Sequence, residues 1–150
     1  MKEKSIHLLV FFSFGVSLKT WVETGLISRE LLLYKQMVKN GHRVSLMTYG
    51  GIEEYQYSDQ LDGIEIVPVY QYLKKGSSKW INLIKSLFIP LKLKCILWKA
   101  DIYKSNQMNG AWVPTFASLL FKRPFVVRCG FEFLRNQLRS ESRKVIWLIK

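Results

Sequence analysis

Short runs of strand length, most of them apolar, alternate along this chain with segments whose apolar residues recur every three or four positions. A run of successive apolar residues is typical of a strand that is covered on both faces, as strands of parallel sheets are. Right-handed crossovers between such strands place the helices on the two faces of the sheet. We therefore predict an α/β fold, a doubly wound, Rossmann-like parallel sheet of about five strands with helices on both faces. The predicted strands are residues Ile6–Phe12, Val44–Thr48, Ile64–Val69, Asp101–Ser105 and Phe125–Cys129.

Four segments have the apolar spacing of helices. The first opens with capping-box spacing between Thr20 and Glu23. The second contains Pro90, so we expect a break or kink there. The four predicted helical segments are residues 20–40, 80–98, 112–121 and 134 onward.

Length and cysteine content favour one domain that no disulfide holds together. A chain of 150 residues, about half of them apolar, is long enough to form one core, so we interpret residues 1–150 as a single domain. Cys95 and Cys129 lie far apart and have no neighbours with metal-ligand spacing. We therefore expect no structural disulfide, no metal site and a cytoplasmic location. The basic start and the apolar run after it also resemble a secretory signal, but His7 interrupts the run, and we prefer a buried first strand.

Positive charge is concentrated in the second part of the chain. Residues 1–65 hold seven Lys/Arg and eight Asp/Glu, whereas residues 66–150 hold sixteen and three. This asymmetry indicates a polyanion or an anionic membrane surface as a possible neighbour.

Residues 74–99 carry seven lysines and no acidic residue, and large apolar side chains lie between the lysines. One interpretation is a helix that lies on an anionic membrane, with its apolar side below the headgroups. The other is a core helix whose lysines face water. The residues predicted for the membrane surface are Lys74, Lys75, Lys79, Trp80, Lys85, Lys92 and Lys94.

In a sheet of this kind, ligands bind at the carboxyl ends of the strands, so the loops there are candidate sites. Neither the dinucleotide fingerprint GxGxxG nor a phosphate-binding Walker A loop is present, which argues against a nicotinamide cofactor and against simple nucleotide hydrolysis. In the first loop, glycine either permits a tight turn or lets a phosphate approach. In the later loops, the asparagines either cap a helix or bind a ligand, and Arg128 requires an anionic partner, Glu132 or a ligand. The candidates are Gly15, Val16, Ser17, Lys19 and Thr20 in the first loop, and Asn106, Gln107, Asn109, Arg128 and Glu132 in the later ones.

Three stretches together resemble one enzyme family. They are GVSLKTWVETGLISRELLLYKQMVKNGHRVSLMT, DGIEIVP and ADIYKSNQMNGAWVPTFASLLFKRPFVVRCGFE, which span nearly the whole chain. In order and separation they resemble the N-terminal half of a family 4-type retaining glycosyltransferase with the two-domain GT-B fold. A typical member has two glycines in tandem in the first loop, where this chain has Gly15 followed by Val16.

The resemblance implies a role in building a polysaccharide or a lipid-linked glycan. This half would bind the acceptor, and residues 15–20 would close over the diphosphate of a UDP- or GDP-linked sugar, with no cofactor and no metal. The paired glutamates of the C-terminal domain are absent here, so the catalytic residues stay unassigned. Because the apolar residues 145–149 end the chain without a cap, we expect it to be truncated, with the second domain missing or on a separate chain. The implied location is the cytoplasm or, for a peripheral protein, the inner face of the membrane.

A different interpretation needs no chemistry. The same charge asymmetry suits a small basic module that docks on an anionic membrane surface or on nucleic acid. Nucleic acid is the weaker form of this alternative, because the sequence lacks an RNA-recognition motif, a zinc finger and an evident helix-turn-helix.

Overall fold

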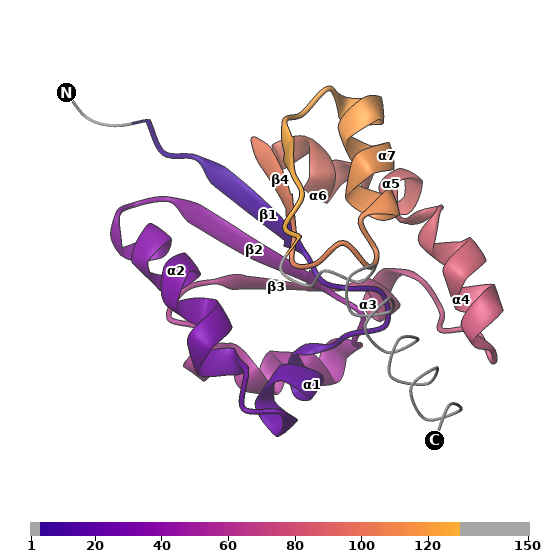
Figure 1. The fold of residues 1–150 in the computed structure, drawn as a ribbon, viewed down its shortest axis with the longest axis horizontal. Coiled ribbons are helices and arrows are strands. Elements are labelled where there is room, and N and C mark those ends of the chain that lie inside the picture. Colours follow the sequence, from indigo (N-terminus) through magenta and orange to yellow (C-terminus); the bar gives the residue numbers. More distant parts are fainter. Residues whose placement is uncertain (1–3, 130–150) are drawn as a thin grey trace, which may run out of the picture.

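The computed structural model describes residues 4–129, which form one five-stranded parallel sheet flanked by helices (Figure 1). The strand order is β3-β2-β1-β4-β5, and every neighbouring pair is parallel. The predicted α/β fold is therefore confirmed, and each predicted strand overlaps an observed one. The strands are β1 (His7–Phe11), β2 (Arg43–Thr48), β3 (Glu65–Pro68), β4 (Ile102–Ser105) and β5 (Phe125–Val126).

Each face of the sheet has its own apolar core, because side chains of one strand alternate between the faces. On β1, Leu8 and Val10 pack under one group of helices, and Leu9 and Phe11 pack under the other. The first group is α1 (Leu18–Glu23), α2 (Ile27–Lys39) and the 3₁₀ segment η1 (Ile52–Gln60). The second is α5 (Ile89–Lys92), α6 (Lys94–Lys99) and α7 (Trp112–Phe121).

The first predicted helix is two helices in the structure, so the capping box was a wrong prediction. Ser17, not Thr20, is the N-cap residue of α1, and its hydroxyl accepts a hydrogen bond from the Thr20 amide. The chain then turns at Gly25, whose φ of +67° is left-handed, and α2 begins at Ile27. Glycine adopts this conformation without the steric cost that other residues pay, which allows the break.

The second predicted helix is three short helices, α4 (Lys79–Ser86), α5 and α6. Pro90 lies in the first turn of α5, where a missing amide costs nothing. Two short elements were not predicted, η1 and α3 (Val69–Tyr72), because neither is long enough to show helical periodicity. The predicted helix from residue 134 lies outside the described residues.

None of the helices within residues 4–129 combines the length and the apolar character that a membrane span requires. Cys95 and Cys129 are both exposed and unpaired.

One glycine allows the loops after β1 and β4 to meet at the carboxyl edge of the sheet. Gly110 has a φ of +96°, and a Cβ atom added there would lie 2.7 Å from the backbone nitrogen of Phe14. The Phe14 amide in turn donates to the Asn109 carbonyl at 3.3 Å. The loop after β4 can therefore lie against the loop after β1 only if position 110 has no side chain.

We expect Gly110→Ala to destabilise the chain more than Gly41→Ala does. Gly41 has a similar φ of +85° but has nothing within 4 Å of its Cβ position, so it reports the conformational cost alone. That cost is about 1–2 kcal/mol, and the clash at position 110 adds about 1–3 kcal/mol. Chemical denaturation of the two variants measures the difference in free energy of unfolding. Equal losses would show that the close approach of the two loops is unimportant.

Candidate functional site

The candidate site lies at the carboxyl edge of the sheet, where the strand order reverses between β1 and β4. From β1 the chain proceeds outward to β2 and β3, and it then crosses back to β4 on the other side of β1. The Asn106 amide, just after β4, donates to the Phe11 carbonyl at the end of β1 at 2.8 Å. The loop after β4 is thus hydrogen-bonded to β1, and the bond from the Phe14 amide to the Asn109 carbonyl joins the two loops.

The loop after β1 carries the residues predicted for the donor diphosphate. Gly15 is exposed, has a φ of +76° and has open space where a side chain would start. The Val16 amide donates to the Ser13 carbonyl at 2.9 Å, which closes a tight turn before Ser17 caps α1. The turn and the helix start are therefore both present at the predicted residues.

A buried carboxylate already occupies the start of α1. Glu54, from η1, accepts hydrogen bonds from the Leu18 amide and from the Thr48 hydroxyl. Burial raises the pKa of the Glu54 carboxyl, and these two donors offset only part of the rise. Within the described residues, the amides of Gly15 and Ser17 bond to no acceptor. Any contact with a phosphate at this loop is thus restricted to the residues before the helix.

An open cleft of about 660 Å³ lies beside this loop, at the ends of β2 and β3. Tyr49 and Tyr70 meet edge to face in its wall, with ring centres 6.3 Å apart, and the Lys75 ammonium lies 5.5 Å from the Tyr70 ring centre. Aromatic rings, cations and exposed backbone suit a polar ligand with an apolar face, as a sugar has. The other residues that line the cleft are Gly15, Ser17, Lys19, Gly50, Gly51, Ile52, Glu53, Glu54, Gln71 and Lys74.

Sequence reasoning missed most of this cleft. The tyrosines and the η1 glutamates were not predicted site residues, and Lys74 and Lys75 were assigned to a membrane surface. The available signal was the Tyr49-Gly50-Gly51 sequence directly after the second predicted strand, which places glycines and an aromatic ring at the carboxyl edge.

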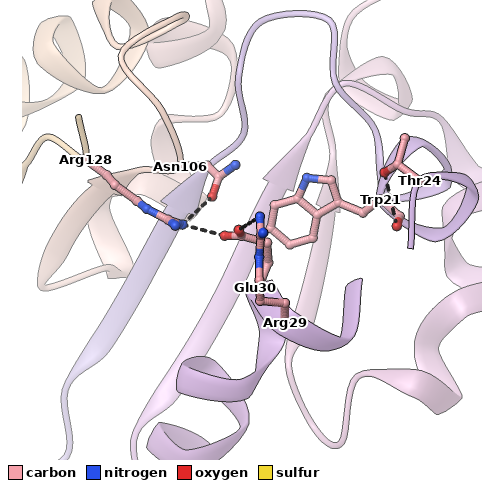
Figure 2. A network of polar contacts seen from close by, with 6 residues as sticks. All are labelled: Trp21, Thr24, Arg29, Glu30, Asn106 and Arg128. Carbon is pink, nitrogen blue, oxygen red and sulfur yellow. Dashed lines mark hydrogen bonds and ion pairs between the residues drawn. The ribbon is translucent and has the colours of Figure 1, made fainter. Parts of the chain in front are cut away.

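Arg128 follows β5 and forms an ion pair across the sheet edge (Figure 2). Its guanidinium donates to the Glu30 carboxylate of α2 and, at 3.5 Å, to the Asn106 side-chain oxygen. Arg29 donates to the same carboxylate at 2.9 Å. The sequence indicated an anionic partner for Arg128, either Glu132 or a ligand. The partner is Glu30, and Glu132 lies outside the described residues.

The two arginines keep Glu30 ionised although its side chain is only 6% exposed. Burial raises the pKa of the Glu30 carboxyl, but hydrogen bonds and charge attraction from Arg128 and Arg29 outweigh this, and the net pKa is lowered. The Glu30 carboxylate in turn raises the pKa of the Arg128 guanidinium. The charge of Arg128 is therefore already paired within the protein.

A second, smaller hollow of about 270 Å³ lies between α2 and β4 beside this ion pair. Lys104 donates to the Tyr34 hydroxyl at 2.7 Å inside it. Burial lowers the pKa of the Lys104 ammonium and raises the pKa of Tyr34 to about 12. Of the cations in this hollow, Lys104 is hydrogen-bonded to Tyr34 and Arg128 is ion-paired with Glu30. The hollow therefore offers a ligand fewer free cations than the larger cleft does.

The loop between β4 and α7 holds the other predicted residues. None of them caps α7, whose N-cap position is Ala111 without a side-chain bond. Asn106 is buried and bonds to Arg128, and Asn109 is exposed and uses its carbonyl on Phe14. The Gln107 side-chain oxygen is buried and has no hydrogen-bond partner among the described residues. The helix-cap interpretation is therefore wrong for these residues.

In residues 4–129, no three histidine, cysteine or carboxylate side chains are grouped as metal ligands.

Two solved structures share this fold. No protein-family model matches the chain, and no curated protein matches it. A glycosyltransferase from Rickettsia africae ESF-5 is similar with a TM-score of 0.51 at 16% identity, over 83% of this chain and 29% of that one. The glycotransferase of kitacinnamycin is similar with a TM-score of 0.51 at 15% identity, over 98% of this chain and 36% of the other. The chain thus has a glycosyltransferase-like fold and spans about a third of the length of these structures.

We expect Glu30→Gln to lower the free energy of unfolding at pH 7 by about 1–2 kcal/mol. This loss is smaller than that expected for a fully buried ion pair, because the Arg128 side chain is 38% exposed. The lowered pKa sets the sign of the pH dependence. The contribution of Glu30 is present above the ordinary carboxyl pKa and is lost as pH falls through the lowered one. The difference between wild type and variant should therefore shrink at acid pH, which denaturation across a pH series measures.

Glu23→Gln is the matched control, because Glu23 forms an exposed ion pair with Lys19. It should change the free energy of unfolding by less than about 0.5 kcal/mol. A Glu30→Gln effect as small as that of the control would contradict a structural role for the ion pair.

Proposed function

We propose that the chain is the N-terminal, acceptor-side domain of a glycosyltransferase, of the retaining family 4 type with the GT-B fold. The observation that carries the proposal is the fold that the chain shares with two glycosyltransferases over most of its length. The polar cleft and loops at the carboxyl edge of the sheet support it, since ligands of open α/β sheets bind there. The reaction is transfer of a sugar from a UDP- or GDP-linked donor to a hydroxyl of a glycan or lipid-linked acceptor.

In this proposal the acceptor binds at the loop after β4 and in the neighbouring cleft. In the proposal the half-buried Gln107 side chain turns its unpaired oxygen outward to accept a hydrogen bond from an acceptor hydroxyl, and Tyr70 offers aromatic surface to a sugar ring. Asn106 and Arg128 support this loop through their bond to each other and through Glu30. These two residues therefore position the loop and do not contact the acceptor.

The donor diphosphate approaches the loop after β1. Gly15 and Ser17 present their amides there, and the exposed side chain of Lys19 lines the same cleft. The Glu54 carboxylate accepts the hydrogen bond of the Leu18 amide in the first turn of α1. In the proposal the phosphate oxygens are therefore bound by amides of the loop and not by amides of the helix.

A second domain completes the site, because the chain spans about a third of the related structures. Holding donor and acceptor in attack geometry contributes about 7–11 kcal/mol to such a reaction, and one domain holds only one of the two reactants firmly. We assign no nucleophile to this chain. The donor sugar is the co-substrate, and the proposal requires no cofactor and no metal.

We expect Gln107→Ala to weaken acceptor binding without weakening the fold. An unpaired buried oxygen contributes nothing to stability, so its removal should leave the free energy of unfolding unchanged or slightly higher. Loss of one neutral hydrogen bond, about 0.5–1.5 kcal/mol, should lower the affinity for an acceptor about three- to tenfold. Calorimetric titration with octyl glycosides of glucose, galactose, mannose and N-acetylglucosamine measures this affinity.

Gln36→Ala is the matched control, since Gln36 is an exposed residue on α2 that bonds to Asn40. It should change neither affinity nor stability. The proposal fails if none of the glycosides binds, or if both glutamine variants bind as wild type does.

A further inference from the structure

Helix α4 presents its polar side to the protein. Ser86, its one buried residue, accepts a hydrogen bond from the Trp112 indole nitrogen at 3.0 Å. Asn82, one turn earlier, accepts from the Gly76 amide at 2.6 Å and donates to the Gly76 carbonyl at 3.3 Å. Residues four apart lie on one side of a helix, so the inward side of α4 is held by hydrogen bonds and not by apolar packing.

The apolar side of α4 faces away from the core. Trp80 is 75% exposed and Ile84 is 59% exposed, and Leu91 continues this side into α5 at 52%. Trp80 and Ile84 are four residues apart in α4 and therefore share one face of that helix. Neither apolar core of the sheet includes a residue of α4, and the helix stands at the edge of the molecule (Figure 1). We call this face the α4 stripe, and its members are Trp80, Ile81, Ile84, Leu87, Phe88 and Leu91.

This arrangement tests the core interpretation of residues 74–99. The core interpretation is correct for α5 and α6, where Ile89, Leu93 and Leu97 are buried. It is wrong for α4, because a core helix turns its apolar side inward. A group of exposed large apolar side chains so close in sequence marks a surface that another body covers.

Exposed lysines precede and follow the stripe along the chain, and no acidic residue lies between Glu65 and Asp101. Lys79 begins α4, and Lys92 and Lys94 follow the stripe, all three exposed. An apolar helix face bordered by cations matches the outer layers of an anionic bilayer, in which acyl chains lie beneath negative headgroups.

We propose that the α4 stripe and its lysines bind an anionic membrane surface, with α4 lying in the plane of the headgroups. A nucleic acid would accept the lysines but would leave the apolar side chains in water. An ordinary protein partner would accept the apolar side chains but would not require a border that lacks any acid. The membrane satisfies both features of the surface.

Co-sedimentation of the full chain with lipid vesicles tests the proposal. We expect strong binding to phosphatidylcholine vesicles that contain phosphatidylglycerol, and weak binding to phosphatidylcholine alone. Replacing Lys79, Lys92 and Lys94 by Gln should weaken binding roughly 100-fold, since each lysine near a charged surface contributes about fivefold. Binding should also fade as added salt shortens the Debye length from about 30 Å at 0.01 M to about 3 Å at 1 M.

The double variant Trp80→Ser/Ile84→Ser tests the apolar contribution, and both side chains are exposed enough for the fold to tolerate the change. It should bind at least about tenfold more weakly, because less apolar area enters the bilayer. Leu32→Ser/Leu119→Ser is its control, with side chains 73% and 74% exposed on α2 and α7. Lys4, Lys39 and Lys122 changed to Gln are the charge control. Equal binding to both vesicle types, equal loss in variants and controls, or binding to duplex DNA without binding to vesicles would overturn the proposal.

Discussion

The structure depends on the burial of β1 on both of its faces. All five residues of this strand are buried, and it pairs in parallel with β2 on one side and β4 on the other. A central parallel strand requires helices above and below it, which determines the two-layer covering of the sheet. Even His7, polar within this strand, is satisfied by Ser45 at 2.7 Å and by the Lys99 carbonyl at 3.2 Å. Because all strands point the same way, their following loops gather at one edge, and the candidate site is a consequence of the sheet.

Two buried carboxylates attach the helices to that edge. Glu54 joins η1 to the start of α1, and Glu30 joins α2 to the loop after β5 through Arg128. The Glu54 contact is made at Leu18, directly after the loop that follows β1, and the Glu30 contact is made at Arg128, in the loop that follows β5. The same carboxylates occupy donors at the site, whereas the amides of Gly15 and Ser17 and the side-chain oxygen of Gln107 have no partner among the described residues.

The strands and the location of the loops at the carboxyl edge were predictable, because apolar runs and helical spacing are local properties of the sequence. Contacts between distant residues were not. Nothing near Arg128 indicated that Glu30, 98 residues earlier, would be its partner. Periodicity was also insufficient for α4, because it reports that a helix has an apolar face but not whether that face turns inward. The break at Gly25 was missed since a glycine inside a helical pattern does not by itself reveal a left-handed turn.

The central claim is that the carboxyl edge of this sheet is the acceptor side of a glycosyl-transfer site. The most direct measurement is the change in backbone amide chemical shifts when the isotopically labelled chain is titrated with octyl glycosides. The account predicts that the shifts cluster at the carboxyl edge, around Gly50, Asn106 and Gln107. Shifts confined to the opposite edge, around Gly41 and Asp101, would contradict it, as would a titration that leaves the carboxyl-edge amides unchanged.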